Sequence, residues 1–305
     1  MQIGMMGLGR MGGNMARRLL RAGHGVIGYN RTYEVARALA DEEGLQAAHS
    51  VEEMVDRLSA PRAVWLMLPA GEPTEDAFRR LGECMDAGDL LVDGGNSNYK
   101  MTIERGLRLA KQGIELVDVG TSGGVWGLTH GYCLMVGGAA AAVERLRPVL
   151  QALAPSSDTG WGHVGPTGAG HFVKMIHNGI EYGLMQAYAE GFEILRAKES
   201  LDLDLYQVAE IWKHGSVIRS WLLELIAETL EADASLADVR AWVADSGEGR
   251  WATFEAVDLD VPAPVMTLAL QARLASRQEE SYAAKLLASM RHRFGGHEIR
   301  RAEPR

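Results

Sequence analysis

The fold of this chain is decided at its N-terminus, by the stretch QIGMMGLGRMG, residues Gln2 to Gly12. Gln2–Met6 is a short, mostly apolar run typical of a buried strand. The spacing GxGxxG follows at once, and a helical pattern over Asn14–Ala22 comes next. In that context the glycines allow a tight turn, a close approach of backbone to a pyrophosphate, and close helix–strand packing. We therefore predict a dinucleotide site, rather than a glycine-rich turn without a ligand, formed by Gly7, Leu8, Gly9, Arg10, Met11 and Gly12.

Apolar strand patterns alternate with helical patterns through the first half of the chain. The predicted strands are Gln2–Met6, Gly25–Tyr29, Gln46–Ala48, Ala63–Leu68, Asp89–Asp93, Glu115–Val119 and Cys133–Val136. This alternation predicts an α/β domain of Rossmann type, with a mostly parallel, doubly wound sheet. Right-handed crossovers place the ligand crevice of such a sheet at the C-terminal ends of its strands.

The composition changes at the glycine-rich stretch Gly160–Gly170. Beyond it, strand patterns largely vanish and helical periodicity dominates to about residue 292. We therefore predict a dinucleotide-binding Rossmann domain over residues 1–167. An all-α helical domain with a C-terminal tail is predicted over residues 168–305.

The bulk composition excludes several classes of protein. A formal net charge of −9 over 305 residues disfavours general binding to nucleic acid or to anionic membranes. Cys84 and Cys133 are the two cysteines, and no Cys/His cluster has zinc spacing, so we expect reduced thiols and no metal site. No apolar run reaches the roughly 18–20 residues needed to span a bilayer. The chain starts directly with a strand pattern, so we expect no signal peptide and a cytoplasmic protein.

The residues that end the second predicted strand bear on the choice of dinucleotide. An NAD site usually carries Asp or Glu there, to hold the ribose hydroxyls. This chain has Asn30, Arg31 and Thr32 instead, and a guanidinium can meet a 2′-phosphate with two hydrogen bonds. The pattern favours NADP. NAD stays an alternative, since Arg31 could instead stack on the adenine, or be a solvated surface charge.

One predicted helix, Gly168–Ala197, carries a stripe of chemically versatile side chains. Lys174, His177, Asn178 and Glu181 stand at i, i+3, i+4 and i+7 and therefore share one helix face. A partly buried lysine has a lowered pKa and can act as a general base, and a shielded glutamate can donate a proton. The alternative interpretation is a solvated face with an i, i+7 charge pattern, and periodicity alone does not decide between the two.

Several motifs together resemble the decarboxylating 6-phosphogluconate dehydrogenases. The most specific is GHFVKMIHNGIEY, residues Gly170–Tyr182, and the others occur in family order along nearly the whole chain. These other motifs are Gly7–Gly12, Asn30–Thr32, Asp93–Ser97, Gly120–Gly124 and Phe294–His297. The resemblance implies oxidation and decarboxylation of 6-phosphogluconate to ribulose 5-phosphate, with a dinucleotide as hydride acceptor.

The same resemblance implies roles for individual residues. Lys174 resembles the base that takes the proton of the substrate's C3 hydroxyl, and Glu181 the acid that protonates C1 of the enediol. Six residues resemble the groups that hold the substrate's carboxylate and hydroxyls in that family: Asn96, Ser122, Gly123, Gly124, His177 and Asn178. Four residues resemble the groups that bind the substrate's phosphate, with His297 nearby: Tyr182, Arg250, Arg273 and Arg291. The loop that lines the nicotinamide resembles Leu68, Pro69 and Ala70, with Asn96 beside it.

In that family Arg291 and His297 would come from a neighbouring subunit, which implies a homodimer or homotetramer with shared active sites. The alternative for Arg291–Arg305 is a basic tail, and no aromatic pattern supports nucleic-acid binding by it.

The chain departs from the family pattern in three places. Arg250 replaces the phosphate-binding lysine, which keeps the charge and changes the geometry. The chain is shorter than the common long form and resembles a short bacterial branch in which NAD use is common. The nicotinamide loop reads Leu-Pro-Ala-Gly, where long forms carry a lysine. Two other functions stay open: a 3-hydroxyisobutyrate-type dehydrogenase, which needs no phosphate cage, and a non-catalytic dinucleotide sensor.

Overall fold

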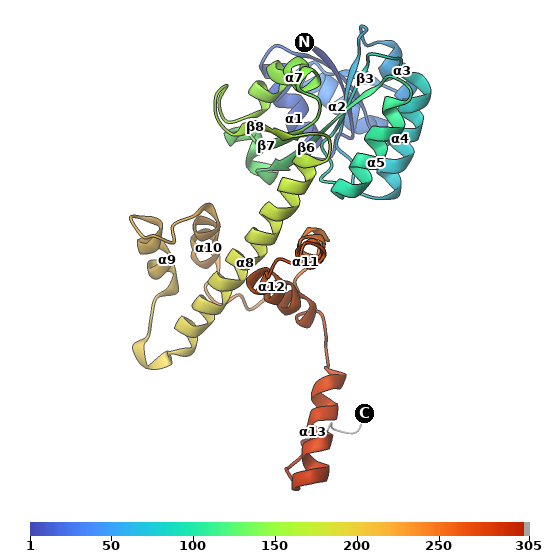
Figure 1. Cartoon of the computed structure of the whole chain (residues 1–305). Helices are drawn as coiled ribbons and strands as arrows, with labels where there is room; N and C mark the ends of the chain where they lie inside the picture. The colour runs from blue at the N-terminus through green and yellow to red at the C-terminus, as the bar shows by residue number, and fades with distance from the viewer. Residues whose placement is uncertain (302–305) are drawn as a thin grey trace. The chain divides into compact units, whose positions relative to one another are not determined.

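The computed structural model describes residues 1–301 and divides into two compact units (Figure 1). The first unit is Met1–Asn178, and the second begins at Gly179. The composition predicted a division after residue 167, in the loop before the long helix. The units divide further along, inside that helix, because its first turns pack on the sheet of the first unit: the backbone of Gly170 lies against that of Asp118 and Met135.

The first unit is built on one eight-stranded sheet with the order β3-β2-β1-β4-β5-β6-β7-β8. Its strands are β1 (Gln2–Met6), β2 (Gly25–Tyr29), β3 (Gln46–Ala48), β4 (Ala63–Leu66), β5 (Leu90–Asp93), β6 (Glu115–Ser122), β7 (Cys133–Gly137) and β8 (Trp161–Gly165). All neighbouring strands are parallel except β6 and β7. The direction of strand order reverses between β1 and β4, and this is the position where such sheets bind their ligands.

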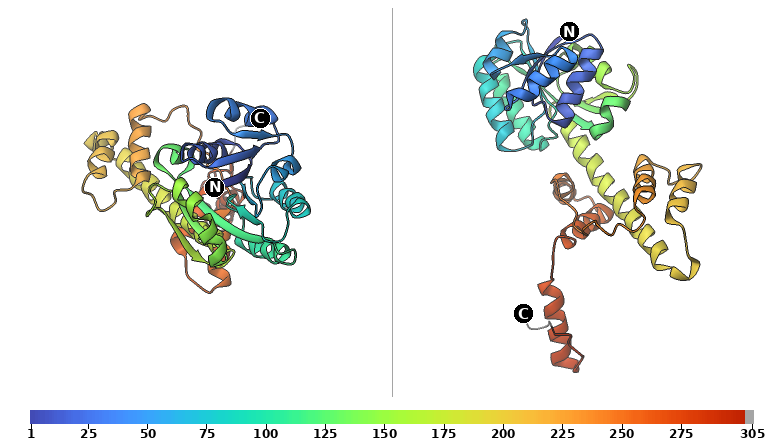
Figure 2. Two further views of the ribbon diagram at one scale, coloured as in Figure 1. Left: turned by 90° about the horizontal axis from the view of Figure 1, so that it is seen from above. Right: turned by 180° about the vertical axis from the view of Figure 1, so that it is seen from behind.

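Helices cover both faces of this sheet (Figures 1 and 2). They are α1 (Arg10–Arg21), α2 (Tyr33–Glu43), α3 (Val51–Asp56), α4 (Glu72–Cys84), α5 (Tyr99–Ala110), the short α6 (Gly127–His130) and α7 (Ala140–Leu153). Residues of α1, α2 and α7 share one buried cluster with the sheet, and residues of α3, α4 and α5 share the other. The predicted Rossmann-type fold is confirmed.

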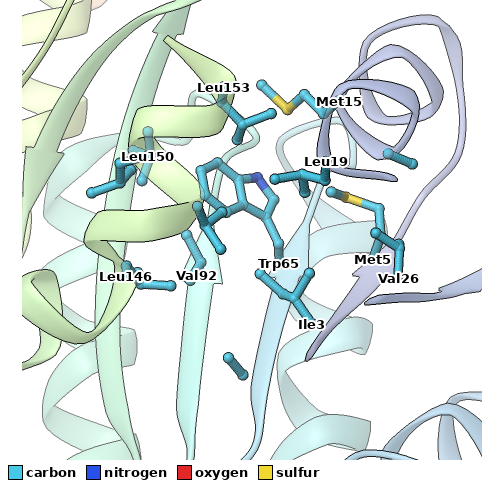
Figure 3. Close-up of a cluster of buried hydrophobic side chains, with 14 of the residues drawn as sticks. Ile3, Met5, Met15, Leu19, Val26, Trp65, Val92, Leu146, Leu150 and Leu153 are labelled. Atoms are coloured by element: carbon cyan, nitrogen blue, oxygen red, sulfur yellow. The ribbon is translucent and has the colours of Figure 1, made fainter. Parts of the chain in front are cut away.

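Trp65 of β4 lies at the centre of the first cluster (Figure 3). Its indole is fully buried among side chains from the sheet and from two of the covering helices, such as Met15 of α1 and Leu150 of α7. The neighbours of Trp65 along the strand, Val64 and Leu66, belong to the opposite cluster. This alternation follows from the two-residue period of a strand, and each fully buried side chain contributes about 1.5–3 kcal/mol.

Two details of the strand prediction are corrected. The pattern Ala63–Leu68 ends as a strand at Leu66, so Leu68 lies in the loop that follows. The strand β8 falls inside the glycine-rich stretch that was interpreted only as a domain boundary. Its sequence, WGHVG, is too rich in glycine to give a strand pattern, and it pairs with β7 through its backbone.

The second unit contains helices and no strand within residues 179–301. Helix α8 (Ala169–Ala197) enters it from the first unit. The others are α9 (Leu205–Lys213), α10 (Trp221–Ala232), α11 (Glu248–Asp258), α12 (Pro264–Ala275) and α13 (Tyr282–Gly295). Within the part of the chain that the structure describes, no helix is both long and apolar enough to cross a membrane.

Candidate active site

The glycine loop between β1 and α1 is shaped to accept an anion. Gly7 has a φ of 95°, and a Cβ at Gly12 would lie 2.0 Å from the carbonyl oxygen of Gly7. Gly9 is the N-cap of α1, where no side chain caps the helix and the first turn holds no acidic residue. A Cβ on Gly9 would meet nothing within 4 Å. The positive end of α1 therefore faces open space, which fits the pyrophosphate of a dinucleotide.

Asn30, after β2, is tied to this loop. Its Oδ1 accepts a hydrogen bond from the backbone N–H of Leu8 (3.1 Å), and its Nδ2 donates to the carbonyl of Thr32 (3.0 Å). Arg31 and Thr32 are exposed, and Thr32 is the N-cap of α2. The residues predicted around the ribose therefore stand beside the glycine loop, with no carboxylate at position 30.

Two loops meet next to the glycine loop, at the ends of β4 and β5. A Cβ on Gly7 would lie 3.0 Å from the Cδ2 of Leu68, and one on Gly95 would lie 2.5 Å from the carbonyl oxygen of Leu68. Pro69 and Ala70, which follow Leu68, are exposed. The predicted nicotinamide loop is thus in direct contact with the loop that carries Asn96.

Asn96 connects that loop to β6. Its φ is 53°, in the left-handed region, and its amide exchanges two hydrogen bonds with the backbone of Thr121: Nδ2 donates to the carbonyl (3.2 Å), and Oδ1 accepts from the N–H (3.0 Å). An amide has two donors and two acceptor lone pairs, so one of each remains for a ligand. Ser122 follows Thr121, and its Oγ lies 3.3 Å from Nε2 of His177. Gly123 and Gly124 continue the turn with φ values of 123° and 53°.

Lys174 lies at the centre of this group. Its side chain is 6% exposed, and its Nζ lies 3.4 Å from Nδ1 of His177. The same Nδ1 lies 3.0 Å from Oδ1 of Asn178. A Cβ on Gly120 would lie 2.4 Å from the Cβ of Lys174, so β6 can approach α8 this closely only with glycine there. The interpretation of this stripe as a solvated face is therefore wrong for Lys174, because α8 packs against β6 at this point.

The start of α8 is fixed by Asp118, a fully buried residue of β6. Its Oδ1 accepts from the backbone N–H of Gly168 (2.6 Å), and its Oδ2 from that of His171 (2.8 Å). A carboxylate at this position satisfies N–H groups at the start of the helix and complements the helix dipole. Asp118 was not predicted as a site residue, although an acidic residue inside the apolar pattern ELVDV is a signal of a buried, paired carboxylate.

Helix α8 continues without interruption into the second unit, which contains Glu181 and Tyr182. Tyr182 is buried, its hydroxyl lies 3.1 Å from Oγ of Ser246, and the guanidinium carbon of Arg273 lies 3.4 Å from its ring centroid. Arg250 donates to Asp245 at 2.6 Å. Within this unit two of the predicted phosphate ligands, Tyr182 and Arg273, stack on each other.

The pairing of Arg250 with Asp245 was not predicted from the sequence. Burial opposes ionisation of Asp245, but the hydrogen bonds from Arg250 and from the backbone of Gly247 hold the pKa of its carboxyl below its usual range. Asp245 is therefore a carboxylate at neutral pH and compensates part of the charge of Arg250. The remaining two predicted residues, Arg291 on α13 and His297 after it, are exposed. Among residues 1–301, no hydrogen bond or ion pair joins either of them to Tyr182, Arg250 or Arg273.

No group of three or more His, Cys, Asp or Glu side chains within residues 1–301 is arranged to hold a metal ion. The two cysteines are free: Cys84 is half-buried in α4, and Cys133 is exposed at the start of β7.

Comparisons with known proteins show which family this chain resembles. Residues 2–162 match the model of the NAD binding domain of 6-phosphogluconate dehydrogenase, and residues 170–293 match that of its C-terminal domain. An NAD⁺-dependent, decarboxylating 6-phosphogluconate dehydrogenase of Haloferax volcanii is 43% identical over 304 residues, which cover 99% of this chain and 100% of that protein. An NADP⁺-dependent one of Bacillus subtilis is 37% identical over 92% of this chain, but this chain spans only 62% of its length.

A solved structure gives the same result. The 6-phosphogluconate dehydrogenase of Plasmodium falciparum superposes with a TM-score of 0.83 at 30% identity, over 100% of this chain and 67% of that one. The sequence matches, the two family models and the shared fold together show that this chain belongs to the 6-phosphogluconate dehydrogenase family.

Proposed function

We propose that this protein oxidises and decarboxylates 6-phospho-D-gluconate, giving D-ribulose 5-phosphate and carbon dioxide, with reduction of a nicotinamide dinucleotide. The observation that carries the proposal is the burial of Lys174 against Gly120, beside His177, at the carboxyl edge of the sheet. A buried amine beside a polar imidazole is placed to exchange a proton with a substrate hydroxyl, which is the task of a general base.

Lys174 takes the proton of the C3 hydroxyl during oxidation. The same side chain, then protonated, donates a hydrogen bond to the C3 carbonyl and stabilises the negative charge that develops there as C1 leaves as carbon dioxide. His177 lies between Lys174 and Ser122, and it orients both toward one substrate position. Glu181 then protonates C1 of the enediol, which is the carbon that was C2 before carbon dioxide left.

The other polar groups hold the two ends of the sugar acid. Asn96, Ser122, Gly123, Gly124, His177 and Asn178 bind the carboxylate and hydroxyls near the sheet. The phosphate is bound by Tyr182, Arg250 and Arg273, together with Arg291 and His297. The stacking of Arg273 on Tyr182 supports this assignment, because it fixes the plane of a guanidinium that can bind phosphate with two hydrogen bonds.

When bound, a dinucleotide would supply the acceptor for the hydride that leaves C3. The glycine loop would hold its pyrophosphate, and the residues that would line its nicotinamide are Leu68, Pro69, Ala70 and Asn96. We propose NADP as the preferred form, because Asn30 places no carboxylate near the 2′ position and Arg31 is exposed beside it. NAD is the alternative, and relatives named for each dinucleotide are similar to this chain.

We also propose a homodimer or homotetramer with shared active sites. Helix α13 buries none of its residues, and its apolar side chains recur every three to four positions. The exposed apolar residues of this stripe are Tyr282, Leu286, Leu287, Met290 and Phe294. An amphipathic helix with an exposed apolar face is expected to pack against another surface, and a second copy of this chain would bring Arg291 and His297 to a neighbouring site.

The test is a spectrophotometric assay of the purified protein with 6-phosphogluconate and either NADP or NAD, with carbon dioxide release measured in parallel. We expect stoichiometric reduction and release, with higher kcat/KM for NADP. Arg31→Ala should reduce kcat/KM for NADP about tenfold, the loss of one charge-assisted hydrogen bond. A preference for NAD that survives this substitution would contradict the dinucleotide assignment.

Two other outcomes would overturn the proposed reaction. Faster turnover of 3-hydroxyisobutyrate than of 6-phosphogluconate would make the protein a 3-hydroxyacid dehydrogenase without a phosphate requirement. Dinucleotide binding without turnover of either acid would make it a sensor.

A further inference from the structure

Arg105 of α5 is a buried cation that the proposed reaction does not use. Its side chain is 1% exposed, and its guanidinium bridges two carboxylates. Nη1 donates to Oδ2 of Asp93 (3.0 Å), while Nε and Nη2 donate to Oε1 of Glu75 (2.9 and 2.7 Å). The guanidinium carbon also lies 5.0 Å from the ring centroid of Phe78. A cation held this tightly inside the first unit fixes the elements that carry its partners.

Asp93 passes this constraint to the loop of Asn96. Its Oδ1 accepts from the N–H of Gly95 (3.1 Å), and its Oδ2 accepts from Oγ of Ser97 (2.9 Å) as well as from Arg105. These bonds hold the residues on both sides of Asn96, whose left-handed backbone is unfavourable for a residue with a side chain. The carboxylate therefore holds the backbone on both sides of Asn96, while Thr121 holds its amide.

Glu75 passes the constraint to the nicotinamide loop. It lies in the first turn of α4, directly after that loop. The preceding residue, Thr74, is buried, and its Oγ1 donates to the carbonyl of Pro69 (2.8 Å). The two loops also touch directly, at Gly95 and the carbonyl oxygen of Leu68.

We propose that Arg105 is a positioning residue, which locks the loop of Leu68–Ala70 and the loop of Asn96 into one arrangement around the reacting atoms. The inference rests on the proposed function, since it assigns those loops to nicotinamide and substrate. Arg105 contacts Asp93, Glu75 and the ring of Phe78, none of which is a predicted ligand-binding residue. A guanidinium is suited to this task because its planar fork meets two carboxylates at fixed angles, which a lysine ammonium does not.

The test compares Arg105→Lys with Arg108→Met. Arg108 lies one turn further along α5, is exposed, and pairs with the other oxygen of Glu75 (3.0 Å), so it is a matched control outside the buried network. For Arg105→Lys we expect kcat to fall about a hundredfold, because a displacement near 1 Å at the reacting centre costs that much. Dinucleotide affinity, followed by quenching of tryptophan fluorescence, should fall about tenfold, and backbone N–H groups at 94–98 should exchange faster with solvent. Arg108→Met should change none of these.

A purely structural role for Arg105 predicts another result. Arg105→Lys would then lower the thermal unfolding midpoint and leave kcat, KM and dinucleotide affinity of the folded fraction unchanged, which would overturn the proposal. If Arg105→Lys does not fold, Ser97→Ala provides the second test, because it removes one donor to Asp93 without leaving a buried charge. We expect this variant to lose kcat about tenfold, and normal kcat would also overturn the proposal.

The two proposals fail in different ways. If the wild-type protein does not turn over 6-phosphogluconate, the proposed function fails. Dinucleotide affinity and exchange at 94–98 would still report whether Arg105 couples the two loops.

Discussion

The two units of this molecule hold their predicted site residues in different ways. In the first, Lys174, Asn96 and Ser122 are fixed by contacts within the unit, above a sheet with a large buried cluster on each face. In the second, the buried clusters are small: one consists of Tyr182, Ala269 and Leu270. Apolar side chains such as Phe294, 78% exposed, remain at its surface. The predicted site residues of the first unit are therefore held by contacts within that unit, whereas we expect the second unit to need additional packing on its exposed apolar side chains.

Lys174→Met and Glu181→Gln test this difference with the largest expected effects. Removing a general base or acid typically costs 10²–10⁴ in rate, so we expect kcat to fall at least about a hundredfold in both variants. Dinucleotide affinity should be retained in both, because the glycine loop is untouched. Steady-state rates and fluorescence titrations measure the two quantities.

For Lys174→Met the thermal stability of the protein can also be predicted. Lys174→Met replaces a buried amine with an apolar side chain of similar length and should not lower the unfolding midpoint of the first unit. Near-normal kcat in either variant would refute the role assigned to that residue.

Charge on the apolar stripe of α13 tests the dependence of the second unit on a partner. Leu287→Glu should weaken self-association roughly a hundredfold, about 2–3 kcal/mol, since a central apolar residue of an interface carries that much. Light scattering should show smaller assemblies, and specific activity should become strongly dependent on protein concentration.

Ala288→Glu is the control, because this exposed residue lies on the other side of α13. If both variants associate and turn over as the wild type does, α13 has no role in a shared site.

Arg250 tests the phosphate cage of the second unit with a smaller effect. Arg250→Met should raise KM for 6-phosphogluconate about tenfold. This corresponds to the lower end of the free energy of a charge-assisted hydrogen bond, because Asp245 already compensates part of the charge of Arg250. Arg250→Lys keeps the charge and should stay within about threefold of the wild type. Dinucleotide KM should not change in either variant, and an unchanged substrate KM in Arg250→Met would remove this residue from the cage.

The pH dependence of this effect follows from Asp245. The pKa of Asp245 is lowered in the folded protein. The ion pair with Arg250 therefore contributes fully to the free energy of folding above the unfolded pKa of about 3.9. That contribution is lost as pH falls through the lowered pKa. Between about pH 6 and 9 Asp245 stays ionised. Its titration should therefore not change the effect of Arg250→Met on KM in this range.

Most of the sheet could be predicted from the sequence, because buried strands carry apolar runs and the GxGxxG spacing fixes the first turn. Strand β8 could not, since WGHVG pairs through its backbone and has little apolar pattern. The periodicity of α8 identified Lys174 and His177 as neighbours on one face. It left open whether that face is buried, because this depends on β6, where Gly120 admits the helix.

The supporting residues were harder to predict. Asp118 and Arg105 act through partners that are distant in sequence, and no local spacing relates Asp118 to Gly168 or Arg105 to Glu75. The pair of Arg250 and Asp245 spans only five residues, but the loop between them has no regular period. Pairs of both kinds depend on the fold and become visible only after it is known.

The smallest expected effect is on the free energy of unfolding, in a comparison of one tyrosine from each unit. Tyr132 is fully buried in the first unit, burial raises the pKa of its hydroxyl to about 12, and the hydroxyl has no hydrogen-bond partner among residues 1–301. Tyr188 of the second unit donates its hydroxyl to the carbonyl of Ile218 and lies 2.9 Å from Oγ of Ser220. Removing an unsatisfied buried hydroxyl relieves a desolvation cost, whereas removing a bonded one loses the bond.

Tyr132→Phe should therefore leave the free energy of unfolding unchanged or raise it by up to about 1 kcal/mol, and Tyr188→Phe should lower it by about 1 kcal/mol. Denaturant titrations at two protein concentrations measure both. The Tyr132→Phe difference should not depend on concentration, because the core of the first unit is closed by its own helices. A loss of stability in Tyr132→Phe would mean that a bound water satisfies the hydroxyl, and a loss that depends on concentration would mean that the first unit, too, is completed by a partner.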